Sequence, residues 1–139
     1  MIKKHFILYI AKCKVNYLPI TVSRKQQGEK ALTVYITQEV RGRDITDAAT
    51  YGDLQILVPA KEQVAFSTQP TVRRITRGLQ KFNDDDYLLV SGDPVAIGIS
   101  CAVASANNRG KFKLLKWDRL EEKYYPLFVN LYQKSTKED

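Results

Sequence analysis

The sequence predicts an α+β domain with a mixed, mainly antiparallel sheet of about six strands and two helices. Short segments rich in β-branched and aromatic residues recur along the 139 residues, and most are joined by short turns. Two other segments, 67–82 and 94–106, have the spacing or end signals of helices. We expect residues 1–133 to form a single globular domain and residues 134–139 a polar tail.

The first half of the chain is expected to supply four strands. Residues 5–11 predict a buried strand, and residues 16–23 predict an extended segment that contains a proline. Residues 31–40 alternate apolar and polar side chains, which is typical of a half-buried strand, and we expect them to form a hairpin with the segment before them. Residues 44–51 fit either a short helical turn or a loop, and residues 53–59 predict another strand.

The segment 67–82 is the clearest amphipathic helix. Val72, Ile75, Leu79 and Phe82 recur at helical spacing and share one face. The outer face carries a basic group, which consists of Arg73, Arg74, Arg77 and Lys81.

A second helix is predicted after a strand at residues 87–90. Asp93 suits the N-cap position and Pro94 the first helical position. Residues 95–106 are small and apolar almost all round, which predicts a buried helix. Residues 111–117 and 123–132 predict two final strands joined by a short turn.

The net charge of +7 is unevenly distributed. Residues 1–30 carry seven Lys or Arg and one acid, residues 70–83 carry four bases and no acid, and residues 84–108 carry four acids and no base. Basic proteins of this kind often bind nucleic acid or another polyanion, although a solubilising surface has the same composition.

Basic and aromatic residues are interleaved near the C-terminus, as on surfaces that bind single-stranded nucleic acid. There, lysines contact phosphates and aromatic rings stack under bases. Lys111, Lys113 and Trp117 share one strand parity, and the helix at 67–82 could extend the surface. The alternative is that Trp117 and Tyr125 fill the core. The candidate nucleic-acid-binding residues are Arg73, Arg74, Arg77, Lys81, Lys111, Lys113, Lys116, Trp117, Arg119 and Lys123.

The turn at Ser91, Gly92 and Asp93 is an alternative phosphate-binding site, because a helix N-terminus offers free backbone N–H groups. However, the spacing from Gly92 to Gly98 does not fit a P-loop, and no lysine follows. Asp93 would also place a negative charge where phosphate should bind. A capped helix that enters the core is the competing interpretation.

The sequence points to no cofactor or metal. His5, Cys13 and Cys101 do not have zinc-ligand spacing, and no nucleophile elbow is present. Asp84, Asp85 and Asp86 are adjacent, and adjacent carboxylates rarely converge on one cation, so we expect a solvated turn. We expect no signal peptide, no membrane span and a cytoplasmic location. These observations favour a non-enzymatic role, and they leave the oligomeric state open.

Two parts of the second half resemble small proteins encoded by tailed bacteriophages. They are the string from Asp84 to Pro94, and Leu114 to Arg119 together with Tyr124 to Pro126. The resemblance implies a host-cytoplasm setting and an accessory role in replication, transcription or counter-defence. It brings no catalytic residue with it.

Three functions therefore stay open at this point. The first is a non-enzymatic accessory protein that binds nucleic acid, most naturally single-stranded. The second is a protein–protein interaction module or inhibitor that acts on an acidic partner; exposed aromatic residues without a continuous basic groove would favour it. The third is a small nucleotide- or phosphate-binding enzyme centred on Gly92 to Pro94.

Overall fold

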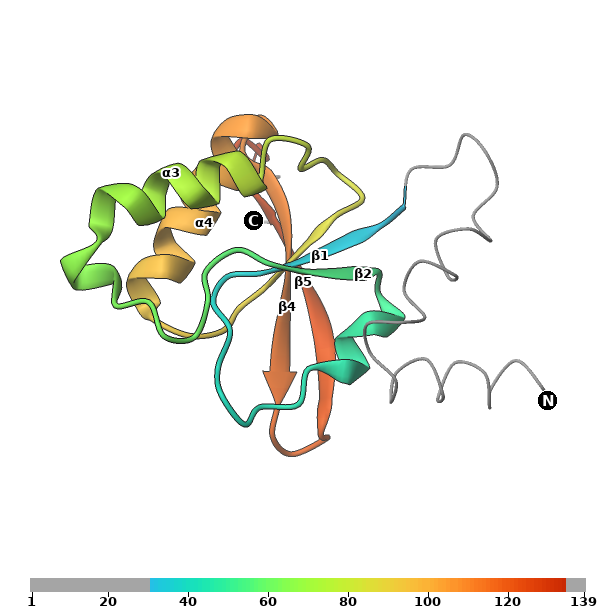
Figure 1. Cartoon of the computed structure of the whole chain (residues 1–139). Helices are drawn as coiled ribbons and strands as arrows, with labels where there is room; N and C mark the ends of the chain where they lie inside the picture. The colour runs from blue at the N-terminus through green and yellow to red at the C-terminus, as the bar shows by residue number, and fades with distance from the viewer. Residues whose placement is uncertain (1–30, 135–139) are drawn as a thin grey trace. The chain divides into compact units, whose positions relative to one another are not determined.

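The structure is a computed structural model that describes residues 31–134. The chain divides into Met1–Ala31 and Leu32–Asp139, and all described helices and strands lie in the second unit (Figure 1). The strands predicted at 5–11 and 16–23 therefore lie outside the described residues, as do His5 and Cys13.

Within the described residues, five strands form one sheet in the order β2-β1-β3-β4-β5. The first four strands in this order are parallel, and β5 is antiparallel to β4. A mixed sheet with two α-helices confirms the predicted α+β class. The balance of pairings differs from the expected one, because three of the four pairings are parallel. The strands are β1 Thr33–Ile36, β2 Asp53–Ile56, β3 Tyr87–Leu89, β4 Lys111–Asp118 and β5 Lys123–Asn130.

Strand β1 lies inside the sheet, and two expectations about it were wrong. Both of its edges are hydrogen-bonded, one to β2 and the other to β3, so it does not pair in a hairpin with the preceding segment. Both faces of the strand are also covered. Val34 and Ile36 are fully buried on one face, and Tyr35 is 3% exposed on the other. The alternation of apolar and polar residues identified the strand. However, Tyr35, on the face expected to be exposed, packs in a separate hydrophobic cluster on that side of the sheet.

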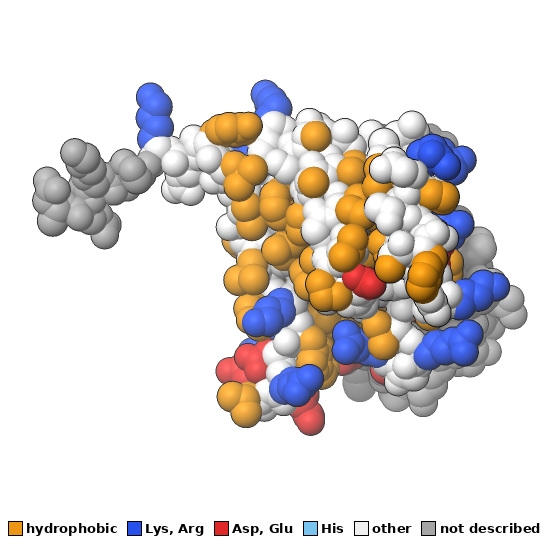
Figure 2. Space-filling model, turned by 90° about the vertical axis from the view of Figure 1, so that its left-hand side faces the viewer, with side chains coloured by type: hydrophobic (Ala, Val, Ile, Leu, Met, Phe, Trp, Pro, Cys, Tyr) orange, Lys and Arg blue, Asp and Glu red, His pale blue; other side chains and the backbone are white. Residues whose placement is uncertain are grey.

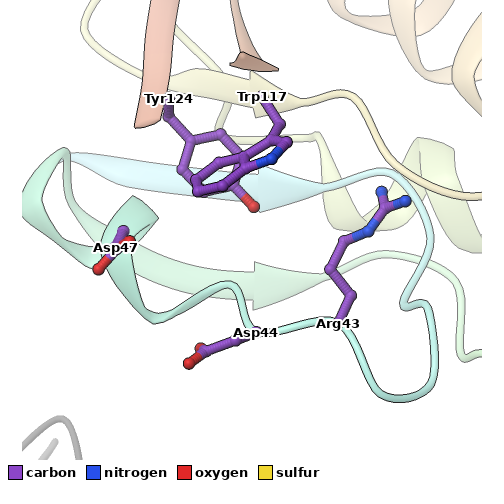
Figure 3. A pocket seen from close by; sticks show the side chains of 5 residues that line it. All are labelled: Arg43, Asp44, Asp47, Trp117 and Tyr124. Atoms are coloured by element: carbon purple, nitrogen blue, oxygen red, sulfur yellow. The ribbon is translucent and has the colours of Figure 1, made fainter. Parts of the chain in front are cut away.

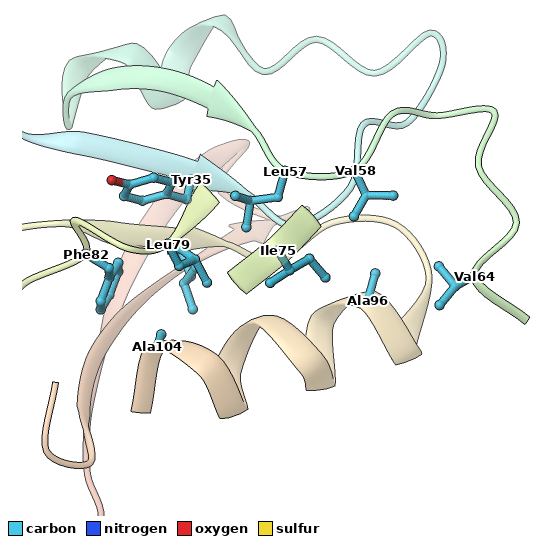
Figure 4. Packing of buried hydrophobic residues seen from close by; sticks show 10 residues of the cluster. Tyr35, Leu57, Val58, Val64, Ile75, Leu79, Phe82, Ala96 and Ala104 are labelled. Carbon is cyan, nitrogen blue, oxygen red and sulfur yellow. The ribbon is translucent and has the colours of Figure 1, made fainter. Parts of the chain in front are cut away.

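Helices α3 (Thr68–Gly78) and α4 (Pro94–Asn107) cover the same face of the sheet (Figure 1). Ile75 and Leu79 from the first helical segment and Ala96 and Ala104 from α4 pack with Tyr35 of the sheet (Figure 4). Val72 is half-buried, so the predicted apolar side chains do face the core, but the helix ends at Gly78, and Leu79 and Phe82 pack there from the turn after it. We call this side of the sheet the helix face.

The start of α4 follows the predicted signals. The Asp93 carboxylate accepts a hydrogen bond from the Val95 N–H at 2.7 Å, and Pro94 occupies the first turn. The prediction of complete burial was wrong, because the buried row comprises Ala96, Ser100 and Ala104, whereas Val95 is 52% exposed. No helix in residues 31–134 is long and apolar enough to span a bilayer.

The opposite face of the sheet is covered by the connection from β1 to β2. This connection contains the 3₁₀-helix η1 (Thr46–Thr50), in which Ala48 packs on Val34, Ile36 and Leu89. A second 3₁₀-helix, η2 (Val64–Phe66), precedes α3. The connection after β1 thus crosses one face, whereas the connection after β3 crosses the other through α4. In open sheets, ligands commonly bind beyond the carboxyl ends of strands where the connections diverge in this way.

Candidate functional site

The basic side chains predicted on α3 lie on its outer surface. Arg73, Arg74 and Arg77 are exposed, and the Arg74 guanidinium forms an ion pair with Glu62 at 3.0 Å. Lys81 follows the helix and is also exposed. These four residues therefore belong to the helix face of the molecule.

The basic and aromatic residues of β4 divide between the two faces of the sheet. Trp117 packs with the apolar cluster on the η1 face, whereas Lys116, one residue earlier, has the opposite strand parity. The Lys113 ammonium is already engaged, because it lies 4.1 Å from the centre of the Tyr87 ring and donates to the Asp85 carbonyl at 2.9 Å. Lys111 is exposed at the start of the strand.

Arg119 lies in the turn from β4 to β5, and Lys123 is the first residue of β5. Lys123 forms an ion pair with Glu121, which raises the pKa of Lys123 through a hydrogen bond and through its charge. The ten predicted residues thus lie on the outside of α3 and just after it, along both faces of β4, and in or beside the β4–β5 turn. Figure 2 likewise shows Lys and Arg side chains scattered over the face seen there. Residues 31–134 carry fourteen Lys or Arg and twelve Asp or Glu, so most of the +7 lies in residues 1–30.

Trp117 lines a pocket of about 280 Å³ on the η1 face of the sheet (Figure 3). Its ring contacts the Tyr124 ring edge-to-face, with the ring centres 4.9 Å apart at an interplanar angle of 64°. The rest of the lining comes from the connection between β1 and β2, and consists of Arg43, Asp44 and, within η1, Asp47. The pocket therefore joins the carboxyl end of β4 to a segment more than sixty residues earlier in the chain.

The charges around this pocket do not favour a polyanion. Arg43 forms no ion pair within residues 31–134, but two carboxylates share the lining with it. The Asp44 carboxylate accepts hydrogen bonds from the Thr46 N–H and hydroxyl. Burial raises the pKa of Tyr124, the Arg43 charge lowers it, and the two aspartates raise it. Phosphate groups near the pocket would meet both attraction and repulsion.

The predicted phosphate site lies at the β3–α4 turn, beside the carboxyl end of β1. Gln38 packs so closely over this turn that a Cβ atom at Gly92 would lie only 2.4 Å from the Gln38 Cβ. The Gln38 Oε1 accepts the Asp93 N–H at 2.8 Å, and the Asp93 carboxylate accepts the Val95 N–H. Two of the backbone donors that a phosphate would use are therefore already satisfied within the chain. Ser91 is 3% exposed, and its Oγ has no hydrogen-bond partner among residues 31–134.

The three consecutive aspartates have different surroundings. The Asp84 carboxylate accepts the Asn108 side-chain N–H at 2.7 Å, whereas Asp86 is fully buried and accepts the backbone N–H groups of Thr33 and Asn83. Asp85 is exposed. In the described part of the chain, no three His, Cys, Asp or Glu side chains gather as metal ligands would.

Large apolar side chains are exposed along β5 and its continuation, and we call them the β5 apolar surface. Phe128 and Tyr132 are each 76% exposed, Leu131 60% and Leu127 40%. Leu127 and Phe128 have opposite parities, so they flank the free edge of the sheet on its two sides.

The continuation of β5 is fixed in place although it is exposed. The Leu131 N–H donates to the Gly110 carbonyl at 3.0 Å, and a Cβ atom at Gly110 would lie 2.6 Å from the Tyr132 ring. Gly110 has φ +76°, a conformation that glycine adopts without strain. Tyr132 thus packs on a backbone that leaves room for its ring, and it still presents most of its surface to solvent.

The backbone of β5 is poorly suited to pairing with another strand. Along an antiparallel pair of strands, hydrogen-bonded and non-hydrogen-bonded residue pairs alternate. The Leu131 N–H bonds to the Gly110 carbonyl, so in the β4–β5 register Leu115 and Pro126 face each other without hydrogen bonds between them. The backbone of Pro126 therefore faces the free edge, where proline has no N–H to donate. In addition, the Tyr124 carbonyl accepts the Tyr51 hydroxyl at 3.0 Å. A partner at this edge would bind mainly through side chains.

Sequence reasoning identified Trp117 but not the residues around it, and it did not identify the β5 apolar surface. The pocket lining comes from residues 43–47, and the segment from 44 was predicted only as a turn or loop. In residues 123–132, both strand parities carry large apolar side chains, as in a strand covered on both faces. That pattern could have drawn attention to β5, but only the sheet order shows that it is an edge strand.

Comparison with known protein families gives a match over most of the chain. The model of a family described as "Phage Pam3 gp32-like protein" matches residues 32–131, which include all described strands and helices. No curated protein and no solved structure matches the chain.

Proposed function

The chain belongs to the Phage Pam3 gp32-like protein family, and from this premise we propose that it is a phage accessory protein that binds another protein through the β5 apolar surface. The observation that carries the proposal is the exposure of four large apolar side chains on a fixed edge strand. Isolated exposed apolar residues are common, but a group of them marks an interaction site more often than chance.

The composition of this surface suits a protein interface. Aromatic residues dominate the energetics of interfaces, and the two aromatic residues here, Phe128 and Tyr132, are the most exposed of the four. Burying a Leu or Phe side chain fully contributes about 1.5–3 kcal/mol, so the exposed fractions leave several kcal/mol available for binding. Because Tyr132 is already seated on Gly110, little ordering is required on binding.

The distribution of charge adds an expectation about the partner. The described unit is nearly neutral, whereas residues 1–30 carry an excess of six positive charges. Complementary charges accelerate association and select partners. We therefore expect the partner to be acidic outside the region that contacts β5.

Site-specific photo-crosslinking tests this proposal. Phe128 is replaced by p-benzoylphenylalanine in the full chain, which is produced in phage-infected host cells and irradiated. We expect a discrete protein adduct, because this side chain would face the partner. The matched control carries the same group at Thr76, an exposed position on α3. Adducts of equal yield from both positions, or no protein adduct from position 128, would contradict the proposal.

Although the two aspartates of the pocket oppose a polyanion, Trp117 supports a second candidate, which is binding of single-stranded nucleic acid through stacking of a base in the pocket. A tryptophan beside an arginine that forms no ion pair within the described part of the chain can stack a base and contact its phosphate. Trp117 is the single tryptophan of the chain, so its fluorescence reports on this pocket directly. This candidate predicts quenching by an oligonucleotide that weakens steeply with salt and is lost in Arg43→Gln. Unchanged fluorescence at low salt would eliminate it.

A further inference from the structure

We propose that two copies of the chain associate through the open face of α4, with the two helices antiparallel. The starting observation is the composition of the helix. Residues 94–108 contain no charged residue, and apolar side chains occur all round the helix. A helix with this composition is normally buried on every side, yet one row of α4 faces solvent.

The open row comprises residues spaced by three or four positions, which share one side of the helix. Val95 is 52% exposed, and Gly98, Ala102 and Ala106 are also exposed. Among residues 31–134, no heavy atom would lie within 4 Å of a Cβ atom at Gly98. Figure 2, which looks onto the side of the molecule where α3 and α4 lie, shows hydrophobic side chains gathered over a broad area.

The charges at the two ends of α4 identify the partner as a second copy. Asp93 precedes the first residue of the helix, and Arg109 follows shortly after its last residue. An antiparallel pairing centred between Ser100 and Cys101 brings Asp93 of each copy near Arg109 of the other. Two complementary charge pairs thus flank an uncharged strip, and the helix dipoles are opposed.

The sizes of the side chains agree with the same arrangement. In this register, Val95 of one copy lies opposite Ala106 of the other, and Gly98 lies near Ala102. Val95, the largest side chain of the row, thus contacts the small Ala106, and the small residues Gly98 and Ala102 lie together near the centre of the interface. Small residues allow two helix backbones to approach closely and to pack along their length.

The first test measures the oligomeric state of the full chain by sedimentation equilibrium. We expect wild type to be dimeric and Ala102→Glu to be monomeric, with a dissociation constant raised at least about a hundredfold, because the carboxylate would be buried without a partner. Thr76→Glu, an exposed change on α3, should leave the dimer intact. Circular dichroism verifies that both variants remain folded.

The second test is a double-mutant cycle with Asp93→Asn and Arg109→Gln. Asparagine caps a helix as well as aspartate, so the first change removes the charge and keeps the cap. Each single change should weaken the dimer by about threefold to tenfold, and the double variant should be little weaker than either. Within one copy, the two residues are roughly 24 Å apart along the helix, so a coupling between them requires a second copy.

The results separate this proposal from the one concerning β5. A monomeric wild type at high protein concentration overturns the α4 dimer, as does an Ala102→Glu variant that remains dimeric. Loss of the dimer in Phe128→Ser alone, with Ala102→Glu unaffected, also overturns it, because the copies would then meet through β5. A monomer that still forms the crosslinked adduct at position 128 leaves the proposed protein-binding function standing.

Discussion

Replacing Asp86 by alanine is expected to lower the free energy of unfolding by about 3 kcal/mol. The carboxylate is fully buried at the amino end of β3 and accepts the Thr33 N–H at 3.0 Å and the Asn83 N–H at 3.1 Å. It therefore ties the start of β1 to the turn that leads into β3. Alanine would leave both backbone donors without an acceptor. Urea denaturation followed by circular dichroism measures the loss.

The neighbouring Asp85 provides the control. Its side chain is exposed, so Asp85→Ala should change the free energy of unfolding by less than about 0.5 kcal/mol. Equal effects of the two substitutions would contradict the assigned role of Asp86.

Tyr35 gives an independent readout of Asp86. Burial raises the pKa of Tyr35, and the Asp86 charge raises it further. Because the pKa of Tyr35 is higher in the folded chain than in the unfolded chain, this group contributes to the stability of the fold. The contribution is fully present below the unfolded pKa of about 10 and decreases as the pH rises above it. Asp86→Ala should lower the pKa of Tyr35 and reduce this alkaline loss.

Replacing Thr37 by valine is expected to cost about 2 kcal/mol of stability. The Thr37 side chain is fully buried after β1, where its Oγ1 accepts the Ser91 N–H at 3.0 Å. The same hydroxyl can donate to the Ser91 carbonyl, 2.6 Å away. Valine keeps the volume but leaves the Ser91 N–H without an acceptor. Thermal and urea unfolding both measure the effect.

Ser91→Ala is the matched comparison, since it removes a hydroxyl from the same buried turn. Within the described residues the Ser91 Oγ has no hydrogen-bond partner, so its removal should leave stability unchanged or raise it by up to about 1 kcal/mol. If Ser91→Ala were as destabilising as Thr37→Val, the bonding assigned to this turn would be incorrect.

The features of the fold that could be predicted from the sequence are the local ones. Asp93 and Pro94 mark the start of α4 because the cap bond joins residues two positions apart. The β4–β5 hairpin is similarly local, as the Asp118 carboxylate accepts the Leu120 N–H within the turn. The pairing of β1 with β2 and β3 joins segments about 20 and 50 residues apart. Such pairings depend on which face each connection crosses, and strand periodicity does not carry that information.

The same distinction applies to the candidate sites. The residue types in the segment from Lys111 to Trp117 suggested an interaction surface, but the positions of its charges on different faces appeared only in the folded sheet. The pocket around Trp117 requires Arg43 to meet β4 across the η1 face, which is a long-range contact. Likewise, the exposure of Phe128 follows from the place of β5 at the edge of the sheet, not from its sequence.

The phage family and the exposed edge strand together suggest how such a small protein could act. A chain whose described part is nearly neutral and whose residues 1–30 are basic can dock by apolar contact and be attracted to an acidic partner by charge. Salt separates the two contributions, because it screens charges but not apolar contacts. The docking step at β5 should therefore survive high salt, while the rate of association falls.

The most direct test of the β5 surface is quantitative capture of the protein that crosslinks at position 128. Wild type, Phe128→Ser with Leu131→Ser, and Arg73→Ser with Arg77→Ser are compared at low and high salt. We predict that the β5 variant loses at least about tenfold in retained partner at both salt concentrations, whereas the α3 variant matches wild type. Full retention by the β5 variant, with loss in the α3 variant, would contradict docking through β5.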